Sequence, residues 1–111
     1  MLSLLLKLQD DNTFVITGIC RNKTDESSTS KYGYVIVSPD KIINQFCYCA
    51  KSKCGLYIVH NHPYGTKPSG VDINTAIRLG HYAADMGLPA LVLGIWDMQH
   101  YVLKEFYIHS N

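Results

Sequence analysis

Leucines recur at every second position near the start of the chain, at Leu2, Leu4, Leu6 and Leu8. This is the period of a half-buried β-strand. Residues 10–12, Asp-Asp-Asn, favour a turn, and the β-branched and aromatic run at 13–20 predicts a second strand, so a hairpin is expected. Further strands are predicted at residues 32–37, 56–59, 90–95 and 101–108. The short apolar run at 56–59 is typical of a strand buried on both faces.

Two segments show helical spacing instead. The first begins at residues 38–41, Ser-Pro-Asp-Lys, where the serine can cap and the proline fits the first helical position. The second opens at Ser69 and stops at Gly87 and Pro89. Their predicted apolar faces are Ile42, Ile43, Phe46 and Ala50 for the first helix, and Ile73, Ala76, Ile77, Gly80 and Ala84 for the second. The order βββαβαββ predicts one α/β domain over residues 1–111, with a mixed β-sheet flanked by two main helices.

Composition narrows the class of protein. Apolar residues make up 47% of the chain and charged residues 17%, which is typical of a globular protein. The formal net charge of +1 gives no electrostatic reason to expect nucleic-acid binding. The N-terminal apolar run is short, has no basic residues before it and no small-residue cleavage site after it, so we expect no signal peptide. No apolar stretch is long enough for a membrane span, and a cytoplasmic protein is expected.

The four cysteines are Cys20, Cys47, Cys49 and Cys54. Without a secretion signal, a disulfide framework has little support. The last three lie close together but lack CxxC spacing, so small buried apolar residues are the favoured interpretation. A second metal site or a redox-sensitive thiol stays open as an alternative.

The stretch VHNHPYGTKPSGVD, residues 59–72, carries the chemistry of the sequence. Residues at i and i+2 of a strand share a face, so His60 and His62 should project together from the end of a buried strand. Ser69 and Asp72 follow a Pro/Gly-rich loop and lie in the first turn of the second helix. Two imidazoles and a carboxylate are a suitable catalytic zinc set that leaves one coordination position open. Other divalent ions would also accept these ligands.

The same serine and aspartate have a second interpretation. Ser69-x-x-Asp72 is a capping pattern that places a carboxylate near the positive end of a helix dipole. Taken alone, this pair favours capping. The combination with an HxH at a strand end favours metal binding for the set as a whole. His81, His100 and His109 lack ligand spacing, Trp96 ends a strand, and Asp97 and Met98 are expected to turn the chain.

HNHP followed by PSGVD resembles the signature of the JAMM (JAB/MPN) metallopeptidases. HNHPYG is similar to the form in bacterial RadC-like proteins, and the tripeptides CRN and GLP and the segment VSPD resemble the JAB peptidases of phage tail assembly. The resemblance implies a JAB/MPN-like fold in which His60, His62 and Asp72 bind Zn²⁺ and Ser69 stabilises an oxyanion. The implied activity is a zinc metallopeptidase or isopeptidase acting on a protein or peptide, such as a ubiquitin-like conjugate or a protein tail.

The sequence departs from the family pattern in two places. The family places a glutamate, the general base, in or before its first long strand, and residues 1–8 hold no acid. Glu26 is the only glutamate before His60, and a solvated surface acid is its favoured interpretation. Either the base is missing, or Glu26 or another group substitutes for it. The loop PYGTKP supplies six residues between His62 and Ser69, one fewer than the family pattern. Asp72 reaches the metal only if the helix start shifts to compensate.

Two other functions are compatible with these residues. The domain could be a catalytically weak or inactive JAB/MPN-fold scaffold or binding module, which the acid-free first strand and the shortened loop favour. It could also be a RadC-like protein associated with DNA repair, a role that rests on family association and that the near-neutral charge does not support. The sequence does not indicate an oligomeric state.

Overall fold

In a computed structural model, the described residues, 2–9, 11, 13–21 and 39–110, form a small compact α/β domain. It has a five-stranded mixed sheet and two helices. The elements are β1 (Leu2–Leu8), β2 (Phe14–Arg21), α1 (Pro39–Ser52), β3 (Gly55–His62), α2 (Gly70–Met86), β4 (Ala90–Asp97) and β5 (Val102–Ser110). The strand predicted at 32–37 lies outside the described residues, and the other predicted elements are confirmed with shifts at their ends.

The five strands lie side by side in the order β2-β1-β3-β4-β5. The predicted hairpin of β1 and β2 is confirmed, since the two strands pair antiparallel. β3 and β4 are the only parallel pair among the described strands, and α2 makes the crossover between them. Neighbouring parallel strands end at the same edge of a sheet. His62 and Asp97, the last residues of β3 and β4, are paired with each other at this edge.

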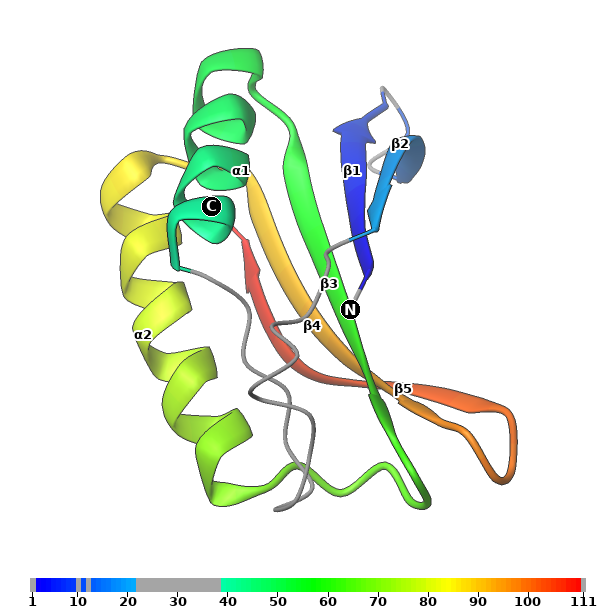
Figure 1. The fold of residues 1–111 in the computed structure, drawn as a ribbon. Helices are drawn as coiled ribbons and strands as arrows, with labels where there is room; N and C mark the ends of the chain where they lie inside the picture. The colour runs from blue at the N-terminus through cyan, green and yellow to red at the C-terminus, as the bar shows by residue number, and fades with distance from the viewer. Residues whose placement is uncertain (1, 10, 12, 22–38, 111) are drawn as a thin grey trace.

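Both helices cover the same face of the sheet (Figure 1). Phe46 and Cys49 of α1 and Ala76 and Ala83 of α2 share one buried cluster with side chains of β3 and β4. The strand side chains in this cluster are Leu56, Ile58, Leu91 and Leu93. Because side chains alternate along a strand, His60 and His62 continue the row of Leu56 and Ile58 and also face the helices.

The predicted apolar faces of the helices were partly wrong. In α1, Phe46 is buried but Ile43 is half exposed. In α2, the buried residues are Ala76, Gly80 and Ala83, whereas Ile73, Ile77 and Ala84 are exposed. Small residues line this face because the helix packs close to β5: a Cβ at Gly80 would overlap the hydroxyl of Tyr107. The face of α2 that is buried is therefore the one whose small side chains let the helix approach the sheet, and not the one with the larger apolar side chains.

The ends of α2 follow from local sequence. Ser69 is the N-cap, and Gly87 follows the last turn in the left-handed conformation, with φ of 74°. The Gly87 N–H bonds back to the carbonyls of the last turn, and the Leu88 N–H bonds to the Ala83 carbonyl. This closes the helix as predicted, because glycine adopts positive φ without a steric penalty.

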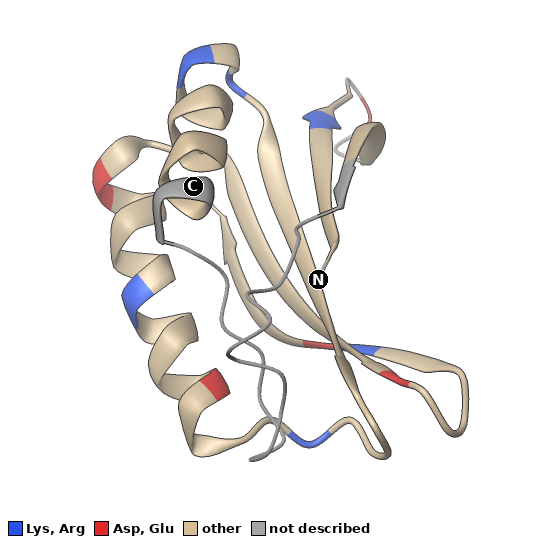
Figure 2. Cartoon of the chain, in the orientation of Figure 1, with Lys and Arg blue, Asp and Glu red and all other residues tan. Residues whose placement is uncertain are grey.

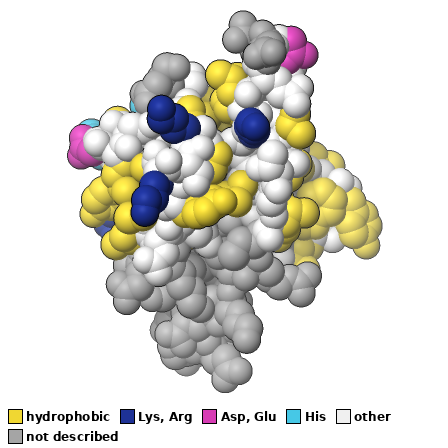
Figure 3. Space-filling view, turned by 90° about the horizontal axis from the view of Figure 1, so that it is seen from above, with side chains coloured by type: hydrophobic (Ala, Val, Ile, Leu, Met, Phe, Trp, Pro, Cys, Tyr) yellow, Lys and Arg dark blue, Asp and Glu magenta, His cyan; other side chains and the backbone are white. Residues whose placement is uncertain are grey.

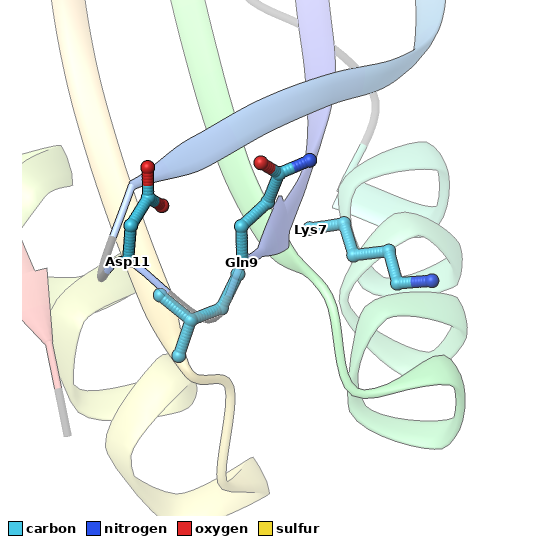
Figure 4. A pocket seen from close by; sticks show the side chains of 4 residues that line it. Lys7, Gln9 and Asp11 are labelled. Atoms are coloured by element: carbon cyan, nitrogen blue, oxygen red, sulfur yellow. The ribbon is translucent and has the colours of Figure 1, made fainter.

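Positions of both charge signs are dispersed along the described part of the chain (Figure 2), and the formal net charge is +1. No described helix is long and apolar enough to cross a bilayer. Viewed from above, the end of the molecule that carries the β1–β2 turn, away from the C-terminal end of β3, shows hydrophobic side chains interspersed with lysine or arginine (Figures 1 and 3). The open pocket beside the β1–β2 turn, lined by Lys7, Leu8, Gln9 and Asp11, lies at this end (Figure 4). It is therefore separate from the histidine pair.

Replacing Gly87 with alanine tests the helix stop. A Cβ there would meet no atom within 4 Å, so only the positive φ opposes it. We expect Gly87→Ala to lower the free energy of unfolding by about 1–2 kcal/mol in urea titrations. Gly70→Ala is the matched control, because that position is equally open and has no positive φ. Equal stability of the two variants would contradict this account of the helix stop.

Candidate metal site

The candidate site forms where β3 ends and α2 begins. His60 and His62 lie on the helix-facing side of β3, and Asp72 is in the first turn of α2. A capping box holds this turn: the Asp72 N–H donates to Ser69 Oγ at 3.1 Å, and the Ser69 N–H donates to Asp72 Oδ2 at 2.8 Å. The predicted capping pattern is thus confirmed. The cap also fixes the aspartate carboxylate against the two imidazole rings.

Three side-chain contacts close a triangle at this point. His60 Nε2 lies 3.1 Å from His62 Nε2 and 3.1 Å from Asp72 Oδ1, and His62 Nε2 lies 3.1 Å from Asp72 Oδ2. The side chains are between 11% and 19% exposed, so the site is largely buried but open to a small ligand. Among the described residues, this is the one group of three His, Cys, Asp or Glu whose ligand atoms lie within 4.8 Å of one another.

Protons alone do not satisfy this triangle. If each Nε2 carries a proton and donates to the carboxylate, the two N–H groups face each other at 3.1 Å. If one ring instead accepts a hydrogen bond at Nε2 from the N–H of the other, its lone pair also faces the carboxylate. With Asp72 ionised, one of the three contacts is therefore between like groups. A shared cation would turn all three side chains into ligands.

The environment favours the protonation states of metal ligands. Burial lowers the pKa of His60, and this outweighs the nearby Asp72 charge, which acts to raise it. Burial by itself would raise the pKa of Asp72, but the Ser69 hydrogen bonds and the two histidines together lower it. Near neutral pH, His60 is therefore held neutral and Asp72 ionised, as metal coordination requires.

The shortened loop does not prevent Asp72 from reaching the histidines. Six residues separate His62 from Ser69, and the Asp72 carboxylate nevertheless contacts both rings. The roles of these residues as metal ligands, and of Ser69 as an oxyanion donor, stay predictions. Ser69 Oγ accepts one hydrogen bond and keeps a hydroxyl proton that it can donate. Glu26 lies outside the described residues.

Sequence reasoning missed the role of Asp97. It was expected only to turn the chain, but it ends β4 and is 4% exposed. Its Oδ1 accepts the N–H groups of Gln99 and His100, and its Oδ2 lies 2.7 Å from His100 Nδ1. The backbone N–H of Gly65, in the loop that joins His62 to Ser69, also acts to lower the pKa of Asp97. An aspartate at the end of the strand next to the HxH strand was the sequence signal.

Hydrogen bonding determines the ionisation of Asp97. Burial alone would raise its pKa, but bonds from the His100 ring and from the backbone N–H groups of His100, Gly65 and Gln99 outweigh it and lower the pKa to about 2. Asp97 is thus an ionised, buried acceptor that holds the β4–β5 turn through Gln99 and His100.

The remaining cysteines and histidines lie elsewhere. Cys49 and Cys54 are buried, as predicted, and burial followed by the neighbouring Cys54 thiol raises the pKa of Cys49 to about 12, which disfavours a reactive thiolate. Cys47 is exposed, so its predicted burial is wrong: it lies on the solvent side of α1, two residues before Cys49. The Cys20 side chain is outside the described residues. His81 is exposed on α2.

Comparison with known proteins leaves the family open. No protein-family model matches the sequence, and no curated protein is significantly similar to it.

The Asp97 carboxylate should contribute a measurable acid dependence to stability. Its pKa falls on folding from 3.8 to about 2, so its stabilising effect is complete above pH 3.8 and is lost as the pH falls toward 2. We expect the wild type to lose more unfolding free energy than Asp97→Asn across this window, measured by urea titration with a chelator present. Parallel curves for the two proteins would contradict the low pKa.

Proposed function

We propose that this protein is a zinc-dependent hydrolase of peptide or isopeptide bonds, with a JAB/MPN-like fold. The observation that carries the proposal is the closed triangle of His60, His62 and Asp72, which lacks a satisfactory arrangement of protons. The order of the elements and the position of the HxH and SxxD segments at a strand end and helix start also support it.

The donor set suits zinc in type and spacing. Imidazole nitrogen and carboxylate oxygen bind Zn²⁺ at about 2.0–2.2 Å, so two ligands of a tetrahedral ion lie about 3.3 Å apart. The separations of 3.1 Å between the ring nitrogens and carboxylate oxygens are close to this value. Three protein ligands leave a position for water, which is typical of catalytic rather than structural zinc sites. When bound, the ion would polarise the substrate carbonyl and make water a nucleophile near neutral pH.

The residues beside the triangle have separate tasks in this proposal. Asp72 is held by the Ser69 N–H, so it is already oriented before any ion binds. The Ser69 hydroxyl, fixed by the Asp72 N–H, can donate its proton to the oxyanion that develops on the scissile carbonyl. The general base must accept a proton from water and return it to the leaving amine, and Glu26 is the candidate. The proposed substrate is a protein or peptide, such as a ubiquitin-like conjugate or a protein tail.

Zinc content of purified variants tests the metal site. We expect about one zinc per chain in the wild type and close to none in His62→Ala, because two ligands cannot hold the ion in a tetrahedral site. His81→Ala is the control, since His81 is an exposed helical histidine away from the triangle. Elemental analysis after dialysis against limited zinc makes the measurement. Equal zinc in all three proteins would rule out the site.

Glu26→Gln tests the catalytic half of the proposal. The amide keeps the size of the side chain but accepts a proton far less readily, so zinc content should be unchanged while turnover falls by about 10²–10⁴-fold. Cleavage of isopeptide-linked and linear peptide substrates provides the assay. Unchanged turnover would remove Glu26 as the base. A wild type that binds zinc but cleaves none of these substrates would instead indicate a binding module.

A further inference from the structure

One extra residue in β5 places Phe106 beside the candidate metal site. β4 pairs with Tyr107 at Leu93 and with Glu105 at the next residue, so the register skips Phe106. This is a β-bulge, in which one strand of an antiparallel pair holds an additional residue, and β5 bends here (Figure 1). The regular alternation of side chains is therefore interrupted between Glu105 and Tyr107.

Because of the bulge, Phe106 and Tyr107 share one side of the sheet although they are adjacent in the chain. Both pack against the buried cluster between the sheet and the helices. Glu105 lies on the other face, because its carboxylate accepts a hydrogen bond from the Tyr57 hydroxyl at 3.0 Å, and Tyr57 alternates with the helix-facing Leu56. In a regular strand Phe106 would point away from the helices. The extra residue thus redirects its ring toward the face that carries the two histidines.

The redirected ring meets His60. The ring centroids of Phe106 and His60 lie 6.1 Å apart and the ring planes cross at 89°, an edge-to-face arrangement that aromatic rings favour. The His60 ring also lies against the His62 ring, with centroids 4.9 Å apart, while its Nε2 lies 3.1 Å from Asp72 Oδ1. Phe106 has no polar atom, so its contact restricts the orientation of the His60 ring without competing for Nε2.

We propose that Phe106 is a positioning residue of the metal site, placed by the β5 bulge so that its ring holds the His60 imidazole with Nε2 toward His62 and Asp72. This inference rests on the proposed metal site, and it adds a residue that the HxH and SxxD signature does not contain. Bulges next to functional sites often re-aim a side chain in this way. An imidazole that is restrained before an ion binds loses less conformational entropy on binding, so the contact raises metal affinity.

The test compares the same substitution at two phenylalanines of one core. Phe106→Leu removes the ring that meets His60 and keeps an apolar side chain. Phe46→Leu is the matched control, because Phe46 is 2% exposed in the same buried cluster but lies on α1, which contributes no residue to the triangle. Phe106→Tyr keeps the aromatic ring. The variants and the wild type are titrated with Co²⁺, whose visible absorption reports the coordination geometry.

We expect Phe106→Leu to bind Co²⁺ about 3–10-fold more weakly than the wild type, as the loss of one aromatic pair implies, and to show a changed visible spectrum. Phe106→Tyr should bind Co²⁺ within about twofold of the wild type, because it keeps the edge-to-face contact. Phe46→Leu should keep the wild-type affinity and spectrum, even though the smaller side chain lowers the free energy of unfolding in urea.

Two results would overturn the inference: a Phe106→Leu protein with the wild-type Co²⁺ affinity and spectrum, or equal affinity losses in the two leucine variants. If Phe106→Leu does not fold, Phe106→Met takes its place under the same criteria. A wild type that binds no Co²⁺ would overturn both this inference and the metal site. A wild type that binds Co²⁺ but hydrolyses nothing would refute only the hydrolase, and the variants would still decide the role of Phe106.

Discussion

The hydrogen bond from the Ser69 N–H to the Asp72 carboxylate is the interaction on which the candidate site depends. It begins α2, and it also fixes the only carboxylate of the triangle against His60 and His62. A free aspartate side chain would lose conformational entropy on binding an ion, whereas this one loses that freedom when the helix forms. Folding of the helix start therefore preorganises a ligand, and the stability of the cap and the geometry of the site cannot be separated.

The crossover from β3 through α2 to β4 brings Ser69 and Asp72, at the start of α2, close to the two histidines at the end of β3. β3 and β4 are parallel, so their ends meet at one edge of the sheet, and α2 must start from that edge to make the crossover. The close packing of α2 on the sheet, with Gly80 against Tyr107, sets the height of the helix above the strands. Phe106 of β5 adds an edge-on contact to the His60 ring, with ring centroids 6.1 Å apart, and so limits where that ring can lie.

Much of this arrangement could be predicted from local sequence, because the relevant signals are local. The strand at residues 2–8, the capping pattern at Ser69 and the glycine stop at Gly87 are each decided within a few residues, and each is confirmed. The half-buried leucine row predicted for β1 is not, since Ser3 is buried with Leu6 and Leu8 is half exposed. The buried face of α2 was predicted only in part, because it depends on Tyr107, a residue far away in the chain. Asp97 was missed for a related reason: its place at a strand end was visible in the sequence, but the pairing that sets this end beside His62 was not.

The two oxygens of Asp72 have different surroundings, and this difference bears on how the site can work. Oδ2 accepts the Ser69 N–H and lies near His62, whereas Oδ1 lies near His60. An oxygen that already accepts a strong hydrogen bond has less electron density to offer a cation, so Oδ1 would be the better ligand atom in the proposed metal site. Binding through one oxygen would leave more of the coordination sphere open than binding through both. In the proposed site, the cap that positions Asp72 would thus also favour the open coordination position that is typical of catalytic metal sites.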